Sequence, residues 1–487
     1  MNSENTERTE LTEVKDESYE ALYEHLRQYG QEHVLRFWHE LDETGRQKLK
    51  SQIQNIDWSN LSESIQKYVL QTPDIEFTED PKPADYWPVE PQNPAQRQQY
   101  DMAVEKGRSV LSEGRVAGFT VAGGQGTRLG FDGPKGTFPI SPVKGKTLFQ
   151  LFAEMILRAQ EKYGTTIPWY IMSSPMNHQD ILDFFEKHDH FGLDPDNLII
   201  FPQGTMPAID FNGKVLLENK DSFALAPDGH GGCLDALRNS GALEDMRKRG
   251  IDHLSYWQVD NPLIKPFDPL FLGLHEETCS DMSSRALIKR DPYEKLGNFC
   301  MVGNELRIVE YSDLSAEKAE QRDEGGNLRY RAGSPAIHLF RRHFIEQVTE
   351  NRELTLPFHR AEKKVKHVNE NGEPVNPETP NAVKLEKFVF DALPLAHNPL
   401  ILEVHRYEQF APVKNKTGFD SIDSARHLMM ERAARWLERA GVPIPRKENG
   451  ELDCRLEISP RNYLDIEDLV SDKENLKAPQ PQDEVYY

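Results

Sequence analysis

The sequence predicts an α/β protein in which a mixed, mainly parallel sheet carries helices on both faces. Short apolar runs alternate with helical patterns from residue 116 to residue 259. This alternation is typical of parallel strands joined by crossover helices. Glycine-rich or polar turns follow three of the apolar runs, and ligands of such sheets bind beyond the carboxyl ends of the strands. The sequence therefore predicts both a sheet and the edge of it where a site lies.

The chain has 487 residues, more than one compact core usually supports, so we expect several domains. We predict an N-terminal helical segment and linker in residues 1–100. An α/β domain is expected in residues 101–395 and a small C-terminal domain with a polar tail in residues 396–487.

The composition restricts the classes of partner. A formal net charge of −22 argues against nucleic acid or an anionic membrane. No apolar run approaches the roughly 18 residues of a membrane span, and the first fifteen residues carry no apolar segment. The 4 cysteines are scattered, so we expect free thiols and a cytoplasmic protein. If the substrate carries phosphates, basic loop residues and a divalent cation must offset this charge. The oligomeric state is left open.

The N-terminal segment shows helical spacing and then a proline-rich linker. Apolar residues recur at three- and four-residue spacing over residues 18–64, which predicts two or three amphipathic helices. Prolines between residues 73 and 94 predict an extended linker anchored by Trp87. A helix is expected over residues 93–113, and residues 1–10 are expected to be frayed.

The remaining elements follow from the same patterns. Residues 280–345 are expected to form mixed strands and turns, and residues 472–487 a disordered acidic tail. Strands are predicted at 116–121, 169–172, 198–201, 253–259 and 387–390, and helices at 147–162, 178–186, 232–249 and 421–441.

The turn after the first of these strands is the strongest candidate for a binding loop. The segment Val121–Gly130 has four glycines within eight residues, and Pro134 and Lys135 follow it. Glycines let a backbone approach a ligand closely, and exposed amides attract phosphate, beside which Arg128 would add positive charge. It is not a Walker loop, because no Gly-Lys-Ser/Thr follows at the required spacing. The alternative is a glycine-rich surface turn.

Two further turns could carry function. Asp260 ends the strand at 253–259, and a carboxylate there suits Mg²⁺, which takes one or two carboxylates plus substrate phosphates. The alternative is a turn or N-cap aspartate. Residues 227–232 form a second glycine turn leading into a helix, either a platform for a base or sugar or a helix start that needs close packing. His230 within it could contact a ligand or be merely solvated.

No constellation suggests a Ser/His/Asp nucleophile or a pair of catalytic carboxylates. Nucleotidyl transfer needs neither, because its nucleophile is an ionised substrate phosphate and catalysis consists of positioning and charge neutralisation. The loop lysines Lys135, Lys384 and Lys414 could serve this role. Each of them singly could equally be a solvated surface charge.

These motifs together resemble the eukaryotic-type UDP-sugar pyrophosphorylases, and within them the UDP-N-acetylglucosamine branch. The resemblance covers most of the chain, from residues 30–41 to residues 410–415. Between these ends it rests on Val121–Gly130 with Pro134-Lys135-Gly136, on Gln203-Gly-Thr-Met-Pro-Ala208, on Ala226–Gly232, on Val259-Asp-Asn261, on Val309-Glu-Tyr-Ser312 and on Lys384–Asp391. It implies a Rossmann-like nucleotidyltransferase core.

The resemblance also implies roles for residues of this chain. Asp260 would bind Mg²⁺, the implied cofactor, and Arg128, Lys135 and Lys414 would be catalytic cations near the phosphates. The remaining positions would bind substrate. Ala122, Gly123 and Gly124 would hold the uridine nucleotide, Gln203 and Gly229 would bind uracil, and Lys384 would bind phosphate. On the sugar side would lie His230, Glu310, Tyr311 and Ser334, with Phe388 and Phe390 forming the wall of the sugar pocket.

The chain departs from the family pattern in two places, and both lie on its sugar side. The pattern has Asn at His230, and it has Ala-Gly-Asn-Ile-Ala-Asn-His where this chain has Ala332-Gly-Ser-Pro-Ala-Ile-His338. Removing or adding a buried hydrogen bond to the substrate there can change substrate discrimination greatly.

The resemblance implies an enzyme that forms UDP-N-acetylglucosamine and pyrophosphate from UTP and N-acetylglucosamine 1-phosphate, with Mg²⁺. The alternative within the family is a UDP-glucose or broad-specificity pyrophosphorylase. An alternative of another class is a nucleotide-sugar-binding regulator without catalysis, against which the combination of Lys135, Asp260 and Lys414 argues.

Overall fold

The computed structural model describes residues 17–71, 79–350 and 356–487. The expected fraying of residues 1–10 therefore lies outside the described residues. The chain divides into two compact units, each assembled from three segments. The first comprises Met1–Asp74, Thr205–Asp228 and Phe358–Glu386, and the second Ile75–Gly204, Gly229–Pro357 and Lys387–Tyr487.

The first unit confirms the amphipathic helices of the N-terminal segment. Helices α1 (Glu17–Arg27), α2 (Glu43–Gln54) and α3 (Trp58–Ser64) bury the apolar positions that recur along them. Asp42 and Asp57 cap α2 and α3, because each side chain accepts a bond from a first-turn amide. The helices share their hydrophobic core with strands β6 (Ile209–Asp210) and β19 (Ala382–Lys387) of the same unit.

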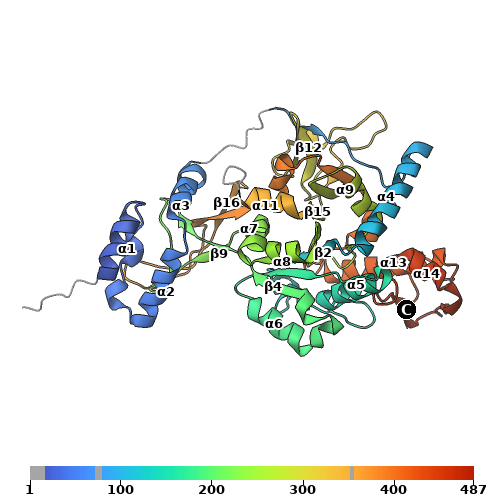
Figure 1. Cartoon of the computed structure of the whole chain (residues 1–487), viewed down its shortest axis with the longest axis horizontal. Coiled ribbons are helices and arrows are strands. Elements are labelled where there is room, and N and C mark those ends of the chain that lie inside the picture. Colours follow the sequence, from blue (N-terminus) through green and yellow to red (C-terminus); the bar gives the residue numbers. More distant parts are fainter. Residues whose placement is uncertain (1–16, 72–78, 351–355) are drawn as a thin grey trace, which may run out of the picture. The chain divides into compact units, whose positions relative to one another are not determined.

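The second unit is built on an 11-stranded mixed sheet, as the alternating pattern predicts (Figure 1). At one end of the sheet, four strands in the order β10-β2-β3-β4 are parallel to one another. Antiparallel β15 joins β10 to the other half of the sheet. The strands are β1 (Lys82–Pro83), β2 (Val116–Val121), β3 (Trp169–Ser173), β4 (Leu198–Pro202), β10 (His253–Gln258), β11 (Met282–Ile288), β12 (Asn298–Val302), β13 (Glu305–Val309), β14 (Ala332–Gly333), β15 (His338–Arg341) and β20 (Leu400–Glu403).

The register of these four parallel strands brings their carboxyl ends to one edge. Val121 of β2 pairs with Gln258 of β10 on one side and with Met172 of β3 on the other. Met172 in turn pairs with Phe201 of β4. The turns that follow β2, β4 and β10 therefore leave the sheet at the same edge, as predicted.

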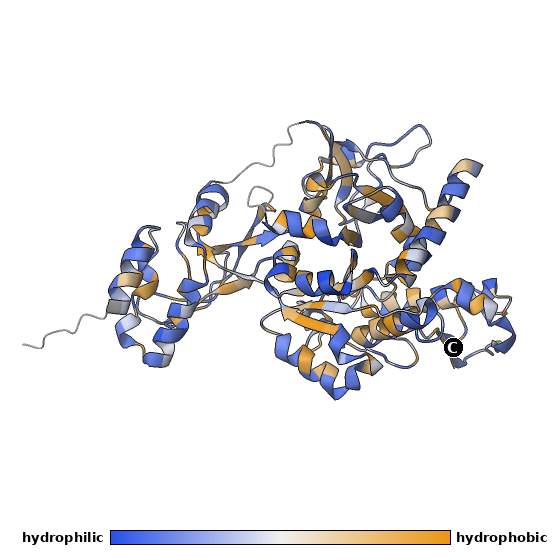
Figure 2. Cartoon of the chain, in the orientation of Figure 1, coloured by the Kyte–Doolittle hydropathy of each residue, from blue (hydrophilic) through white to orange (hydrophobic). Residues whose placement is uncertain are grey.

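Helices cover both faces of this sheet (Figure 1). Alternate residues of β3 belong to different cores: Trp169 and Ile171 face one, while Tyr170 and Met172 face the other. Figure 2 shows β4 as almost wholly apolar, as expected of a parallel strand between two layers. Helices α4 (Pro94–Ser112), α5 (Leu148–Tyr163), α6 (His178–Lys187) and α9 (Pro269–Glu277) pack on the first face, and α7 (Cys233–Asn239), α8 (Ala242–Arg249) and α11 (Arg342–Glu350) on the second.

Two predicted elements are wrong. The helix expected over residues 232–249 is two helices, α7 and α8, because Gly241 between them adopts a left-handed conformation (φ +80°). The strand expected at 387–390 is absent. Strand β19 ends at Lys387, and residues Val389–Leu395 form a 3₁₀ helix, η10, whose Val389 and Phe390 are buried against the second core.

The tail expected to be disordered is instead tied to the second unit. Strand β22 (Glu484–Tyr486) pairs in parallel with β21 (Arg455–Glu457). Val485 and Tyr487 pack on a hydrophobic cluster formed with helix α13 (Ile422–Arg439). The apolar residues among the acidic ones thus order the tail. No helix in the described parts of the chain is long and apolar enough to cross a membrane.

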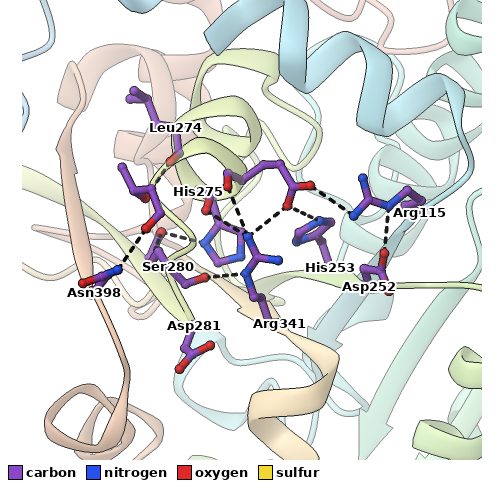
Figure 3. A network of polar contacts seen from close by, with 12 residues as sticks. Arg115, Asp252, His253, Leu274, His275, Ser280, Asp281, Arg341 and Asn398 are labelled. Atoms are coloured by element: carbon purple, nitrogen blue, oxygen red, sulfur yellow. Dashed lines mark hydrogen bonds and ion pairs between the residues drawn. The ribbon is translucent and has the colours of Figure 1, made fainter.

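A network of charges occupies the opposite end of the four parallel strands (Figure 3). Arg115, just before β2, pairs with Asp252 at 2.7 Å and with Glu276 at 3.1 Å, and Arg341 binds Glu276 at 2.9 Å. The pKa of Glu276 is lowered by His253, whose Nε2 lies 3.2 Å from the Glu276 carboxylate, and by the charges of Arg115 and Arg341. Because these groups lie at the amino ends of the strands, they stabilise the fold rather than contribute to the candidate site.

Candidate active site

The glycine loop after β2 is closed by hydrogen bonds within its own backbone, and it packs against the turn that follows β4. The Gly126 amide donates to the Gly133 carbonyl at 2.9 Å, and the Lys135 amide donates to the Gly124 carbonyl at 3.0 Å. A Cβ on Gly123 would lie 2.9 Å from Oε1 of Gln203, so a side chain there would displace the Gln203 amide. The structure thus places Gln203, which is 9% exposed, directly against the loop.

The loop keeps backbone donors available for a ligand. Among the described residues, the amides of Gly124 and Gln125 find no protein acceptor. Arg128 follows on an exposed turn, η4 (Thr127–Leu129). Unpaired amides and a nearby guanidinium are the groups that phosphate oxygens accept bonds from.

Lys135 connects the glycine loop to the end of β10. Its Nζ lies 3.7 Å from Oδ2 of Asp260, and its Cε lies 3.9 Å from the position that a Gly124 Cβ would occupy. Asp260 is buried, 8% exposed. The structure therefore brings Lys135 of the turn after β2 next to the carboxylate of Asp260, which follows β10.

The segment that bears Lys414 is fixed to the same strand end. The Val413 amide donates to the backbone carbonyl of Asp260 at 2.8 Å. The side chain of Asn261 donates to the Gln409 carbonyl at 2.7 Å and accepts from the Ala411 amide at 3.0 Å. Asn261 is thus a positioning residue to which the sequence motif assigned no role, and its partners are about 150 positions away.

A second group forms around the glycine turn at residues 227–232. Gly229 has a φ of +86°, which favours glycine, and the ring of His230 stacks on Phe388 at 5.2 Å with an interplanar angle of 14°. Phe390 lies 5.8 Å from the same ring. The Val389 amide donates to Nδ1 of His230 at 3.2 Å. The predicted sugar-side residues His230, Phe388 and Phe390 therefore form one aromatic cluster.

Close backbone packing makes this cluster possible. A Cβ on Gly231 would lie 2.6 Å from backbone atoms of Lys387 and Phe388. Gly231 is therefore required for the approach, and no local sequence pattern identifies its partner.

Glu310 and Ser334, the other two sugar-side candidates with partly buried side chains, flank Gly297. Oε1 of Glu310 lies 3.3 Å from the position of a Gly297 Cβ, and the Ser334 amide donates to the Gly297 carbonyl at 2.9 Å. Tyr311 is 44% exposed. Lys384 lies on β19, in the first unit, and its role stays a prediction.

Asp260 fits a metal site that substrate must complete. No group of three or more His, Cys, Asp and Glu side chains in the described residues could hold a metal ion. Mg²⁺ commonly takes one or two carboxylates, with waters and substrate phosphates as its other ligands. A single buried carboxylate beside the glycine loop meets that requirement.

Comparison with known proteins agrees with this geometry. The family model for UTP–glucose-1-phosphate uridylyltransferase matches residues 63–469. The human UDP-N-acetylhexosamine pyrophosphorylase-like protein 1 is 38% identical over 86% of this chain and 85% of its own. UDP-N-acetylglucosamine diphosphorylase 2 of Arabidopsis thaliana is 36% identical over 87% and 86%.

Solved structures show the same fold. The crystal structure of a UDP-N-acetylglucosamine pyrophosphorylase from Entamoeba histolytica matches with a TM-score of 0.72 and 31% identity, over 84% of this chain and 99% of that one. The Trypanosoma brucei enzyme of that name, in complex with an inhibitor, matches with a TM-score of 0.78 and 25% identity, over 94% and 95%. The chain belongs to the UTP–glucose-1-phosphate uridylyltransferase family.

Proposed function

We propose that this chain is a uridylyltransferase that forms UDP-N-acetylglucosamine and pyrophosphate from UTP and N-acetylglucosamine 1-phosphate. The observation that carries the proposal is the meeting of the glycine loop, Lys135 and Asp260 at one edge of the sheet. Relatives named for UDP-N-acetylglucosamine or UDP-N-acetylhexosamine support the choice of sugar.

In the proposed reaction a phosphate oxygen of the sugar 1-phosphate attacks the α-phosphorus of UTP in line. A new phosphorus–oxygen bond forms, the bond to the β-phosphate oxygen breaks, and its electron pair leaves with pyrophosphate. Both phosphates are ionised at neutral pH, so the protein needs no general base. Its task is to hold the reactants in line and to stabilise charge on the phosphates.

The chain supplies the groups for this task. Gly123 and Gly124 would let the nucleotide lie on the loop, and Gln203 offers an amide to the uracil edge. Arg128, Lys135 and Lys414 would neutralise phosphate charge. Mg²⁺, the proposed cofactor, would be held by Asp260 and would supply further charge neutralisation.

The sugar would lie against the aromatic cluster. His230, Phe388 and Phe390 offer ring faces, while Glu310 and Ser334 offer polar atoms. A UDP-glucose or broad-specificity pyrophosphorylase is the second candidate. It is supported by the family's description, which specifies glucose 1-phosphate, and by His230 and Ser334, where the chain departs from the pattern.

One assay tests both candidates. Purified protein with UTP, Mg²⁺ and either N-acetylglucosamine 1-phosphate or glucose 1-phosphate should release pyrophosphate, faster with the N-acetylated sugar. If pyrophosphate were released neither with these two sugars nor with any other sugar 1-phosphate, the uridylyltransferase proposal would be refuted. We also propose a cytoplasmic location, which four cysteines without disulfides support.

A further inference from the structure

A short loop after Lys414 carries a second lysine, Lys416. Hydrogen bonds within the loop fix its conformation. The amides of Lys414 and Asn415 both donate to the Asp420 carbonyl, at 2.7 and 3.0 Å. The side chain of Asn415 donates to the Phe419 carbonyl at 2.9 Å. At its start the loop is anchored through Val413 to Asp260. The loop therefore has a defined position relative to the end of β10.

Lys416 lies against the glycine loop. Its Cδ is 3.6 Å and its Nζ 3.7 Å from the position that a Cβ on Gly130 would occupy. Gly130 itself has a φ of +72°, which favours glycine. The lysine stem thus covers a residue of the phosphate-binding loop that has no side chain of its own.

The charge of Lys416 is not neutralised by the protein. Among the described residues, neither Lys414 nor Lys416 forms an ion pair. The chain as a whole has 80 acidic and 58 basic residues. In such an acidic protein, unpaired cations beside a loop with free amides form a local site for an anion.

We propose that Lys416 binds the pyrophosphate moiety, the β- and γ-phosphates of UTP before the reaction and free pyrophosphate after it. This inference rests on the proposed function. Gly130 lies at the far end of the loop from Gly123 and Gln203, which would hold the uridine, so the distal phosphates are the part of UTP that reaches it. A lysine suits them, because its flexible stem can follow them as they leave.

Binding of inorganic pyrophosphate tests the inference without requiring turnover. The variants are Lys416→Met and Lys416→Arg, and the matched control is Lys187→Met, since Lys187 is also exposed and also lacks an ion pair among the described residues. Calorimetry with pyrophosphate and Mg²⁺ should show about tenfold weaker binding by Lys416→Met, the loss expected for one charge-assisted hydrogen bond. Lys416→Arg and Lys187→Met should bind as the wild type does.

Kinetics provide a second measurement. Lys416→Met should raise the KM for UTP about tenfold and leave the KM for the sugar 1-phosphate unchanged. Unchanged pyrophosphate affinity in Lys416→Met would overturn the inference, as would an equal loss in Lys187→Met. The proposed function fails on a different result, the absence of turnover by the wild type.

Discussion

Lys135 and Asp260 form an ion pair of 3.7 Å between the glycine loop and the end of β10. The two side chains are 16% and 12% exposed, so this charge pair is largely shielded from water. It holds the lysine over the loop and holds the carboxylate where substrate phosphates would arrive. We therefore make a separate prediction for each of the two residues.

Replacing Lys135 with alanine should reduce turnover and leave the fold intact. If the ammonium stabilises charge that develops on the phosphates, its loss should lower kcat by about 10²- to 10³-fold. Steady-state kinetics with UTP and N-acetylglucosamine 1-phosphate measure the loss, and circular dichroism checks the fold. The control is Lys187→Ala, at an exposed position on α6. A kcat within twofold of the wild type would contradict the assigned role.

Replacing Asp260 with asparagine should raise the Mg²⁺ requirement. The backbone carbonyl that anchors Val413 remains, so the change removes the negative charge of the proposed metal ligand and, with it, the ion pair to Lys135. We expect the Mg²⁺ concentration for half-maximal rate to rise about tenfold or more. A Mg²⁺ titration of the rate measures it, with Asp183→Asn on α6 as the control. Metal dependence equal to that of the wild type would exclude Asp260 as the ligand.

The edge of the sheet that carries the candidate site could be predicted from the sequence, because the sequence patterns that indicate it are local. Each of the four parallel strands is a short apolar run, and the functional turns follow such strands directly, as Ala122 follows β2 and Gln203 follows β4. The parallel order then places these turns at one edge. No tertiary information is needed for that step.

The contacts that fix the site could not be predicted in the same way. Asn261 binds residues 409 and 411, and Gly231 packs on the backbone of Phe388, across more than 140 positions in each case. The strand expected at 387–390 is wrong for a related reason. Its β-branched and aromatic residues favour a strand, but in the fold Val389 and Phe390 are buried as part of a 3₁₀ helix.

Replacing His230 with asparagine should increase discrimination in favour of N-acetylglucosamine 1-phosphate over glucose 1-phosphate. Asparagine can still accept a bond from the Val389 amide, but it uncovers the face of Phe388 on which the imidazole stacks. The vacated space admits the larger N-acetyl group, which gains more contact than the hydroxyl of glucose.

A change of this size in an apolar pocket is worth about tenfold in the ratio of the two kcat/KM values. Both substrates are measured with the same enzyme preparation, and the KM for UTP, which should not change, is the internal control. A ratio that stays constant, or that moves toward glucose 1-phosphate, would exclude His230 as a determinant of sugar choice.

His338 should make the protein less stable in mild acid. The residue is fully buried, and its Nδ1 lies 2.8 Å from Oγ of Ser284. Burial and the charge of His230 lower the pKa of His338 to about 3, whereas a histidine in an unfolded chain has a pKa of about 6.5. Between these values the unfolded state binds a proton that the folded state does not. The free energy of unfolding therefore falls as pH falls through this range.

One such group contributes about 1.4 kcal/mol per pH unit within the range, or roughly 2 kcal/mol between pH 7 and pH 5. His338→Asn removes this contribution and retains a polar partner for Ser284. Urea unfolding at the two pH values, followed by tryptophan fluorescence, should show a pH dependence smaller by about that amount in the variant. The other buried histidines, such as His275, are present in both proteins, so their contributions cancel in the comparison. Identical pH dependence in the two proteins would show that His338 is not held neutral by burial.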